Sequence, residues 1–117
     1  IICVKRNPLD QYSELKLHKG MHNPEEFINW FIHLKKMESR SEFKDDKVLE
    51  ISFEDFVLNF KHKSKEICRF LNISDQIDSK YNPYLSKNNI GKYKNLLDDK
   101  EISLIKNSLS KYINMDF

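Results

Sequence analysis

Apolar positions along the chain follow two different patterns, which predict strands and helices. The apolar run from Ile1 to Lys5 is typical of a strand that is covered on both faces of a sheet, and Asn7-Pro8 ends it. A second run predicts a strand from Val48 to Phe53. Because helical stretches lie between and after these strands, we expect the strands to be parallel.

Elsewhere, apolar residues recur at three- and four-residue steps, which predicts helices. We expect helices from Asp10 to about Lys19, from Pro24 (capped by Asn23) to Met37, from Glu54 to Ile73, and from Asp99 to Tyr112. Their expected inward faces are Phe27, Trp30, Phe31, Leu34 and Met37; Phe56, Val57, Phe60, Ile67, Cys68 and Leu71; and Ile102, Ile105, Leu109, Tyr112 and Ile113. The polar stretches at 38–46 and 74–89 predict loops, the second with room for one helical turn.

This order of elements favours the α/β class, but two strands would leave both edges of a sheet exposed. We therefore expect a single partial domain over residues 1–117, forming the C-terminal portion of a larger parallel-sheet α/β domain. The two glycines of the chain are too few for a Gly-rich phosphate loop, so we expect that loop in a missing N-terminal part.

Composition narrows the function classes only a little. The net charge of +2 gives no global electrostatic reason to expect nucleic acid as a partner, and no apolar run reaches the ~18 residues of a membrane span. Cys3 and Cys68 form no metal-binding or disulfide pattern, and we expect two reduced thiols. His18 and His22 have a spacing that suits a metal, but Gly20 between them indicates a helix end, and we expect no metal site.

Three polar stretches carry candidate binding chemistry. In "VKRNPLDQYS", Arg6 follows the end of a strand, where ligands of open α/β sheets bind, and Ser13 adds a hydroxyl. In "ISFEDF", Phe53 ends the second strand and can pack on a ligand base or in the core. In "SKNNIGKYK", Lys87, Asn88 and Gly91 lie in a basic loop suited to wrapping an anion. Each stretch alone also fits a solvated surface or ordinary packing.

Taken together, the three stretches resemble the C-terminal half of the PAPS-dependent sulfotransferases. "VKRNPLDQYSEL" is similar to the family's "(V/I)xRxPxD" segment and its following serine, and "ISFEDF" to a strand that leads into "YED". "FLNI" is similar to "FLGL", and "NNIGKYKNLLDDKEISLIKNSL" to the "GxW(K/R)xxL" loop and terminal helix. The resemblance implies a P-loop-type, three-layer α/β/α fold and a sulfuryl transfer from PAPS, which leaves PAP as the product.

The resemblance also implies roles for individual residues. Arg6 and Ser13 would hold the 3′-phosphate of the cofactor with help from Lys87, while Phe53 would pack on the cofactor and Asn88 and Gly91 would offer backbone amides. The sequence departs from the family in two of these places. Ser13 is seven residues after Arg6 instead of eight, with the carboxylate of Glu14 at the eighth position, and Phe53 replaces the tyrosine.

Catalytic residues are not assigned and are expected upstream of Ile1, so that this part alone should be inactive. The acceptor, with a hydroxyl or amine group, could be a small molecule, a glycan or a peptide, and a complementary chain could complete the site. Phe27, Trp30 and Phe31 could line an acceptor pocket, but we favour core packing for them. Two other readings stay open: a nucleotide kinase-like P-loop protein, and a non-catalytic helical interaction domain.

Overall fold

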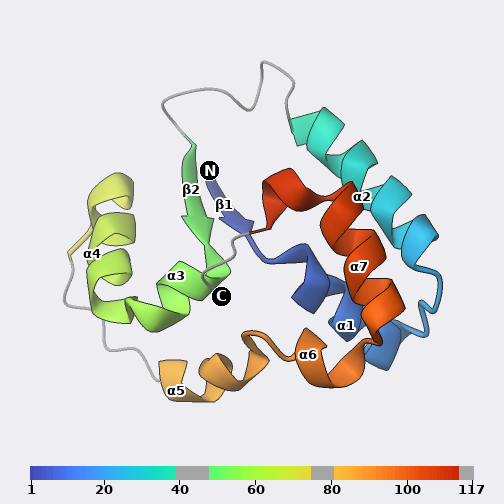
Figure 1. Cartoon of the computed structure of the whole chain (residues 1–117). Coiled ribbons are helices and arrows are strands. Elements are labelled where there is room, and N and C mark those ends of the chain that lie inside the picture. The colour runs from blue at the N-terminus through green and yellow to red at the C-terminus, as the bar shows by residue number, and fades with distance from the viewer. Residues whose placement is uncertain (39–47, 75–80, 114–117) are drawn as a thin grey trace. The chain divides into compact units, whose positions relative to one another are not determined.

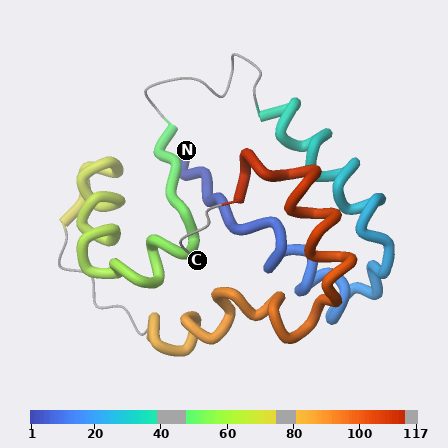
Figure 2. The backbone as a smooth tube through the Cα atoms, in the orientation of Figure 1, coloured from blue at the N-terminus to red at the C-terminus, as the bar shows by residue number. Residues whose placement is uncertain are grey.

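The computed structural model describes residues 1–38, 48–74 and 81–113. The elements are β1 (Ile2–Lys5), α1 (Pro8–Lys19), α2 (Pro24–Glu38), β2 (Leu49–Ser52), α3 (Phe53–Leu58), α4 (Phe60–Leu71), α5 (Pro83–Ser86), the 3-10 turn η2 (Lys87–Asn89), α6 (Tyr93–Leu96), α7 (Asp99–Ser108) and the 3-10 turn η3 (Ser110–Tyr112) (Figure 1). The chain divides into two compact units, which we call the strand unit (residues 1–6 and 46–90) and the helical unit (residues 7–45 and 91–117). Figure 2 follows the backbone through each of them.

The strand unit contains the sheet. Strands β1 and β2 pair in parallel, with Ile2 opposite Leu49 and Lys5 opposite Ser52, which confirms the predicted pairing. The prediction that the first strand is covered on both faces is wrong for the described residues, because Val4 is 63% exposed while its neighbour Ile51 is 4% exposed. Among the described residues β1 pairs with β2 alone, and the helix that packs on this sheet, α3, contacts β2.

The helix predicted from Glu54 to Ile73 is in fact two helices. Ser52 caps α3, since its Oγ accepts the Asp55 amide at 3.1 Å, and the break falls at Asn59. At this break the Asn59 backbone leaves the helical region, with a φ of −122° and a ψ of +46°, and its side chain donates to Asp55 Oδ1 at 2.8 Å. Helix α4 ends at Asn72 in the left-handed conformation.

A small core lies within the strand unit. Its buried apolar residues are Ile51, Val57 and Cys68, and the rings of Phe56, Phe60 and Tyr81 pack together with centroids 5.3–5.8 Å apart. Leu71, predicted to face inward, is exposed. Both cysteines are free thiols, as expected, with Cys68 buried and Cys3 half-buried.

The helical unit has the larger core. Its fully or nearly buried apolar residues come from α1, α2, α6, α7 and their adjoining turns: Leu9, Tyr12, Phe27, Ile28, Phe31, Tyr93, Leu97, Ile105 and Leu109. Asn23 caps α2 through its Oδ1, as predicted. Of the predicted inward face of α2, however, Trp30 and Met37 are 44% and 40% exposed, because α2 packs on α7 through Phe27, Ile28 and Phe31.

The C-terminal segments differ in detail from the predictions. The expected loop at 74–89 contains α5 and η2, and its residues 75–80 lie outside the described ones, as do residues 39–47 of the other expected loop. Helix α6 was not predicted. The final helix ends at Ser108 and is followed by η3, but Ile105 and Leu109 are fully buried, as its apolar stripe predicts. The α/β class and a small parallel sheet are present in a helix-rich chain.

Candidate functional site

Arg6 and Phe53 lie next to each other because of the strand register. Since Lys5 is opposite Ser52, the residues that follow the two parallel strands are Arg6 and Phe53. The Arg6 guanidinium carbon lies 4.9 Å from the centre of the Phe53 ring, and its Nη2 donates to the Asn89 carbonyl at 3.1 Å. Within the strand unit, Arg6, from the first of the three polar stretches, therefore contacts Phe53 from the second and Asn89 from the third.

This arrangement fixes the plane of a permanent positive charge at the carboxyl end of β1. A cation over an aromatic face gains about 0.5–2 kcal/mol, more where it is shielded from water, and Arg6 is half-buried. A guanidinium matches a phosphate or sulfate with two parallel hydrogen bonds, and less of its freedom is lost when its plane is already held. The Arg6–Phe53 pair is therefore suited to anion binding.

Lys87 and Asn88 belong to the same unit as Arg6. Both are exposed residues of η2, and the Lys87 ammonium lies 4.7 Å from the centre of the Tyr84 ring. The contact to Arg6 is made instead by the next residue, Asn89, through its backbone carbonyl, which side-chain reasoning did not single out. The predicted roles of Lys87 and Asn88 toward a ligand stay predictions.

In the helical unit, Asp10 holds the turn that contains Gly91. Its side chain is buried, and its two oxygens accept the amides of Gly91 at 2.9 Å and Tyr93 at 3.1 Å. Gly91 has a φ of +77°, which residues with a side chain rarely adopt. Glycine adopts such a φ without strain, as expected for this loop. In the sequence, Asp10 was predicted only to begin a helix, and no local signal distinguishes that position from one that holds a distant turn.

A model of the sulfotransferase domain family matches residues 1–113. The chain belongs to the sulfotransferase family. No curated protein and no solved structure gives a significant match. The family assignment confirms the resemblance seen in the three polar stretches, and it supports a transferase with an α/β fold. The P-loop-type three-layer arrangement stays a prediction.

The serine of this sulfotransferase chain is buried inside the helical unit. The Ser13 hydroxyl donates to the Leu9 carbonyl at 2.9 Å, and the residue has no exposed surface. Its neighbour Glu14 forms ion pairs with Lys92 and, at 3.2 Å, with His18. The carboxylate at the family's usual serine position is therefore offset by a lysine from the Gly91 turn, and the role of Ser13 stays a prediction.

A second buried polar network ties α1 to α7 in the sulfotransferase chain. Glu101 accepts hydrogen bonds from Tyr12 at 3.0 Å and Lys16 at 2.8 Å, and it forms a capping box with Asp98. Burial, followed by the hydrogen bond to Glu101, raises the pKa of Tyr12 well above its usual range. Burial acts to raise the pKa of Glu101 as well, but the hydrogen bonds from Lys16 and the Asp98 amide outweigh it and lower that pKa.

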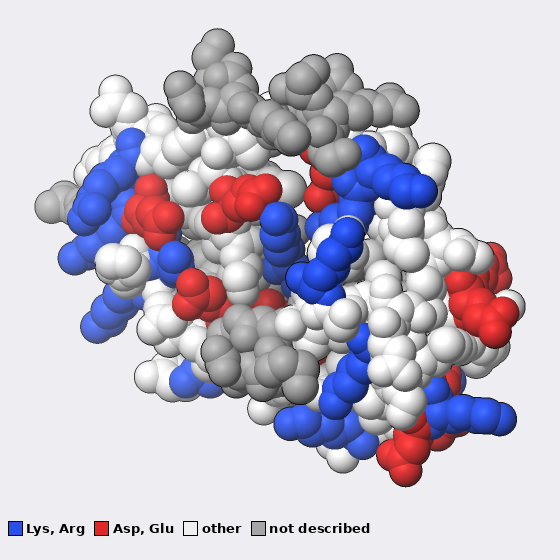
Figure 3. Space-filling view, turned by 45° about the horizontal axis from the view of Figure 1, so that its top comes forward, with Lys and Arg blue, Asp and Glu red and all other residues white. Residues whose placement is uncertain are grey.

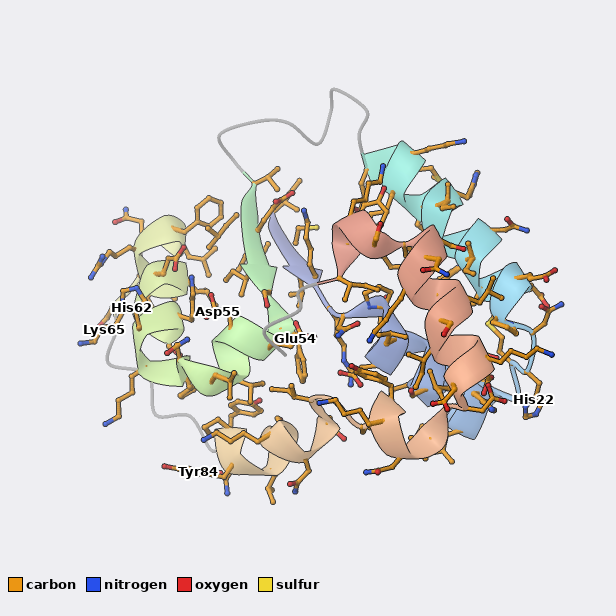
Figure 4. All side chains as sticks on the ribbon, in the orientation of Figure 1. His22, Glu54, Asp55, His62, Lys65 and Tyr84 are labelled. Atoms are coloured by element: carbon orange, nitrogen blue, oxygen red, sulfur yellow. The ribbon has the colours of Figure 1, made fainter. Side chains whose placement is uncertain are left out.

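The histidines of α1 and its following loop form no further part of the candidate site. Gly20 ends α1 in a left-handed conformation, as expected, so His18 lies in the helix and the exposed His22 beyond it (Figure 4). Among the residues that the structure describes, no group of three or more His, Cys, Asp or Glu side chains is placed to hold a metal ion. In the same residues, no helix is both long and apolar enough to cross a bilayer.

Proposed function

We propose that the protein transfers a sulfuryl group from PAPS to a hydroxyl or amine acceptor, and that this chain binds the 3′-phosphate and adenosine side of the cofactor. The observation that carries the proposal is the Arg6 guanidinium held between the Phe53 ring and the Asn89 carbonyl, at the carboxyl end of a parallel strand. The family to which the chain belongs supports the reaction class.

The residues of the strand unit have distinct parts in this proposal. Arg6 binds the 3′-phosphate through charge-assisted hydrogen bonds, and Lys87 adds a second positive charge. Phe53 keeps the guanidinium in place on one face of its ring, and an adenine can pack on the other. Lacking a hydroxyl, Phe53 can contribute packing but no hydrogen bond.

The helical unit contributes Ser13 and the turn around Gly91 to the proposal. The Gly91 amide already donates to Asp10, so this glycine acts through its backbone conformation and its lack of a side chain, not as a free donor. The cofactor itself supplies the activated sulfuryl group and a bisphosphate leaving group. Cations near the departing 5′-phosphate favour transfer because they stabilise the negative charge that develops there, whereas Arg6, on the 3′-phosphate, holds and orients the cofactor.

Binding of adenosine 3′,5′-bisphosphate by the intact protein that carries this chain tests the proposal. A charged hydrogen-bonded contact is worth about 1.5–3 kcal/mol, so Arg6→Ala should weaken binding about 10- to 100-fold in calorimetry. Arg6→Lys should fall in between, because it keeps the charge but loses the planar fork. Arg69→Ala, which removes an exposed arginine from α4, is the matched control and should bind like the wild type.

Two results would contradict the proposal. Unchanged bisphosphate binding by Arg6→Ala would remove Arg6 from the site and would favour a non-catalytic domain. Tighter binding of ATP than of adenosine 3′,5′-bisphosphate would favour a kinase-like nucleotide site, since ATP lacks the 3′-phosphate that Arg6 is proposed to bind.

A further inference from the structure

A cleft in the strand unit lies between the α3–α4 corner and α5. It has a volume of about 530 Å³, within the range of about 300–1,000 Å³ that is usual for small-molecule sites. The residues that define its chemistry are Val57, Phe60, Lys61, His62, Tyr84 and Lys87. Figure 4 labels His62 near the start of α4 and Tyr84 on α5. The cleft therefore combines a helix start with a short helix from a distant part of the sequence.

The lining of this cleft combines apolar and aromatic side chains with basic ones. Val57 is buried, Phe60 is half-buried, and Tyr84 is an exposed aromatic side chain. Lys61, His62 and Lys87 add basic groups, and none of the residues that line the cleft is acidic. A flat organic body that carries a negative charge matches both parts of this lining.

The described residues do not neutralise two of these basic groups, Lys61 and His62. Among the described residues, neither Lys61 nor His62 has a carboxylate within ion-pair distance, whereas the next lysine, Lys63, pairs with Asp55 at 3.3 Å and with Glu66 at 3.1 Å. Asp55 interacts electrostatically with His62, but its oxygens are taken by the Asn59 amide and by Lys63. An anion in the cleft would thus meet two basic groups, Lys61 and His62, that have no ion-pair partner in the described part of the chain.

The helix start adds to this electrostatic picture. Phe60, Lys61 and His62 are the first three residues of α4, whose positive dipole end therefore lies at the cleft. Asn59, at the cap position, makes no capping hydrogen bond because its side chain is bound to Asp55. The basic character continues along α4 with the exposed Lys65 (Figure 4), although basic and acidic side chains are interspersed over the face that Figure 3 shows.

We infer that this cleft is a binding site for a small organic anion, with an aromatic body held by Phe60 and Tyr84 and a sulfate, phosphate or carboxylate group held by Lys61 and His62. The cleft contains neither Arg6 nor Phe53, although Lys87 lines it and also has a part in the proposed cofactor site, so the inference is tested at Lys61 and His62 and does not depend on the proposed function. Aromatic side chains bind flat bodies through offset stacking, and the basic groups select those bodies that are charged.

Titration of the ¹⁵N-labelled intact protein that carries this chain with 2-naphthyl sulfate, followed by NMR, tests the inference. The amide signals of residues 57–62 and of Tyr84 should shift, with a dissociation constant at least about tenfold below those of 2-naphthol and inorganic sulfate. The first comparison removes the charge and the second removes the aromatic body. Parallel titrations with 2-naphthyl phosphate and 2-naphthoate identify which anionic group the cleft prefers.

Variants locate the contact. Lys61→Gln and His62→Gln should each weaken binding of 2-naphthyl sulfate about 3- to 10-fold, since each removes one basic group that contacts the anion. Lys65→Gln is the matched control, because it removes the same charge from an exposed position of the same helix outside the cleft, and it should change binding less than about twofold. Arg6→Ala should leave this binding intact.

Several results would overturn the inference. Equal binding of 2-naphthol would show a site without charge selectivity, and equal loss in Lys65→Gln would show attraction to the helix in general. Displacement of 2-naphthyl sulfate by adenosine 3′,5′-bisphosphate would assign the cleft to the cofactor. The proposed function is tested by different variants and a different ligand, so that either can fail while the other stands.

Discussion

Replacement of Asp10 is the sharpest test of how the Gly91 turn is held. Asp10 has 1% of its surface exposed, and its two oxygens accept the amides of Gly91 and Tyr93. In Asp10→Ala both amides lose their acceptor in a place that water does not readily reach. In Asp10→Asn one oxygen remains, but an amide group now faces the second backbone donor, so one of the two hydrogen bonds is lost.

The expected loss of stability follows from these two contacts. A hydrogen bond to a charged group is worth about 1.5–3 kcal/mol, and a buried donor left without an acceptor costs about 1–3 kcal/mol. We therefore expect Asp10→Ala to lower the free energy of unfolding by about 3–5 kcal/mol and Asp10→Asn by about 1.5–3 kcal/mol. The larger loss is a substantial part of the roughly 5–15 kcal/mol that stabilises a typical domain.

Urea denaturation and amide hydrogen exchange measure this effect in two independent ways. Exchange at Gly91 and Tyr93 should become faster in Asp10→Ala relative to the rest of the helical unit. Asp99→Asn, at an exposed aspartate of the first turn of α7, is the matched control and should lose at most about 1 kcal/mol. A loss below about 1 kcal/mol in Asp10→Ala, with unchanged exchange at both amides, would refute the anchoring role.

Two further predictions concern the same unit. The pKa of Glu101 is lower in the folded chain than its usual value of 4.5, so its stabilising contribution is present above that pH and is lost as the pH falls through the folded pKa. The urea midpoint should fall between pH 7 and pH 3, and this fall should be smaller in Lys16→Met. An equal fall in Lys16→Met and in the wild type would contradict the role of Lys16. Gly91→Ala and Gly20→Ala should each cost about 1–2 kcal/mol, because both positions have a positive φ but room for a methyl group. A loss well above 3 kcal/mol would indicate a steric clash instead.

Element types were predictable from the sequence where one local signal dominated. Capping residues and apolar periodicity placed the helices that contain Phe27 and Ile105 correctly. The break at Asn59 was not predictable from periodicity, because the apolar pattern continues across it while the Asn59 backbone leaves the helical region. The exposure of Val4 was missed for a different reason. An apolar run indicates that a strand is suited to burial, but it does not show whether another element covers each of its faces.

The candidate site was predictable as a set of stretches but not as a set of contacts. Strand order places Arg6 and Phe53 at the same end of a parallel sheet, and their stacking follows from the register. The Asn89 carbonyl escaped prediction because backbone acceptors leave no mark in the side-chain sequence. Asp10 escaped it because one aspartate near a helix start looks the same whether it faces its own helix or a distant turn.

The spacing between Arg6 and Ser13 has a physical meaning that the fold now makes clear. Successive residues of an α-helix differ by about 100° in direction, so Ser13 and Glu14 cannot face the same group. Glu14 is paired with Lys92, and a carboxylate in that state repels a phosphate less than a free one would. Ser13 can serve a phosphate only by giving up its hydrogen bond to the Leu9 carbonyl, which is worth about 1 kcal/mol. A hydrogen bond to a charged phosphate is worth about 1.5–3 kcal/mol, so the exchange favours the ligand if the helix start lets the phosphate approach.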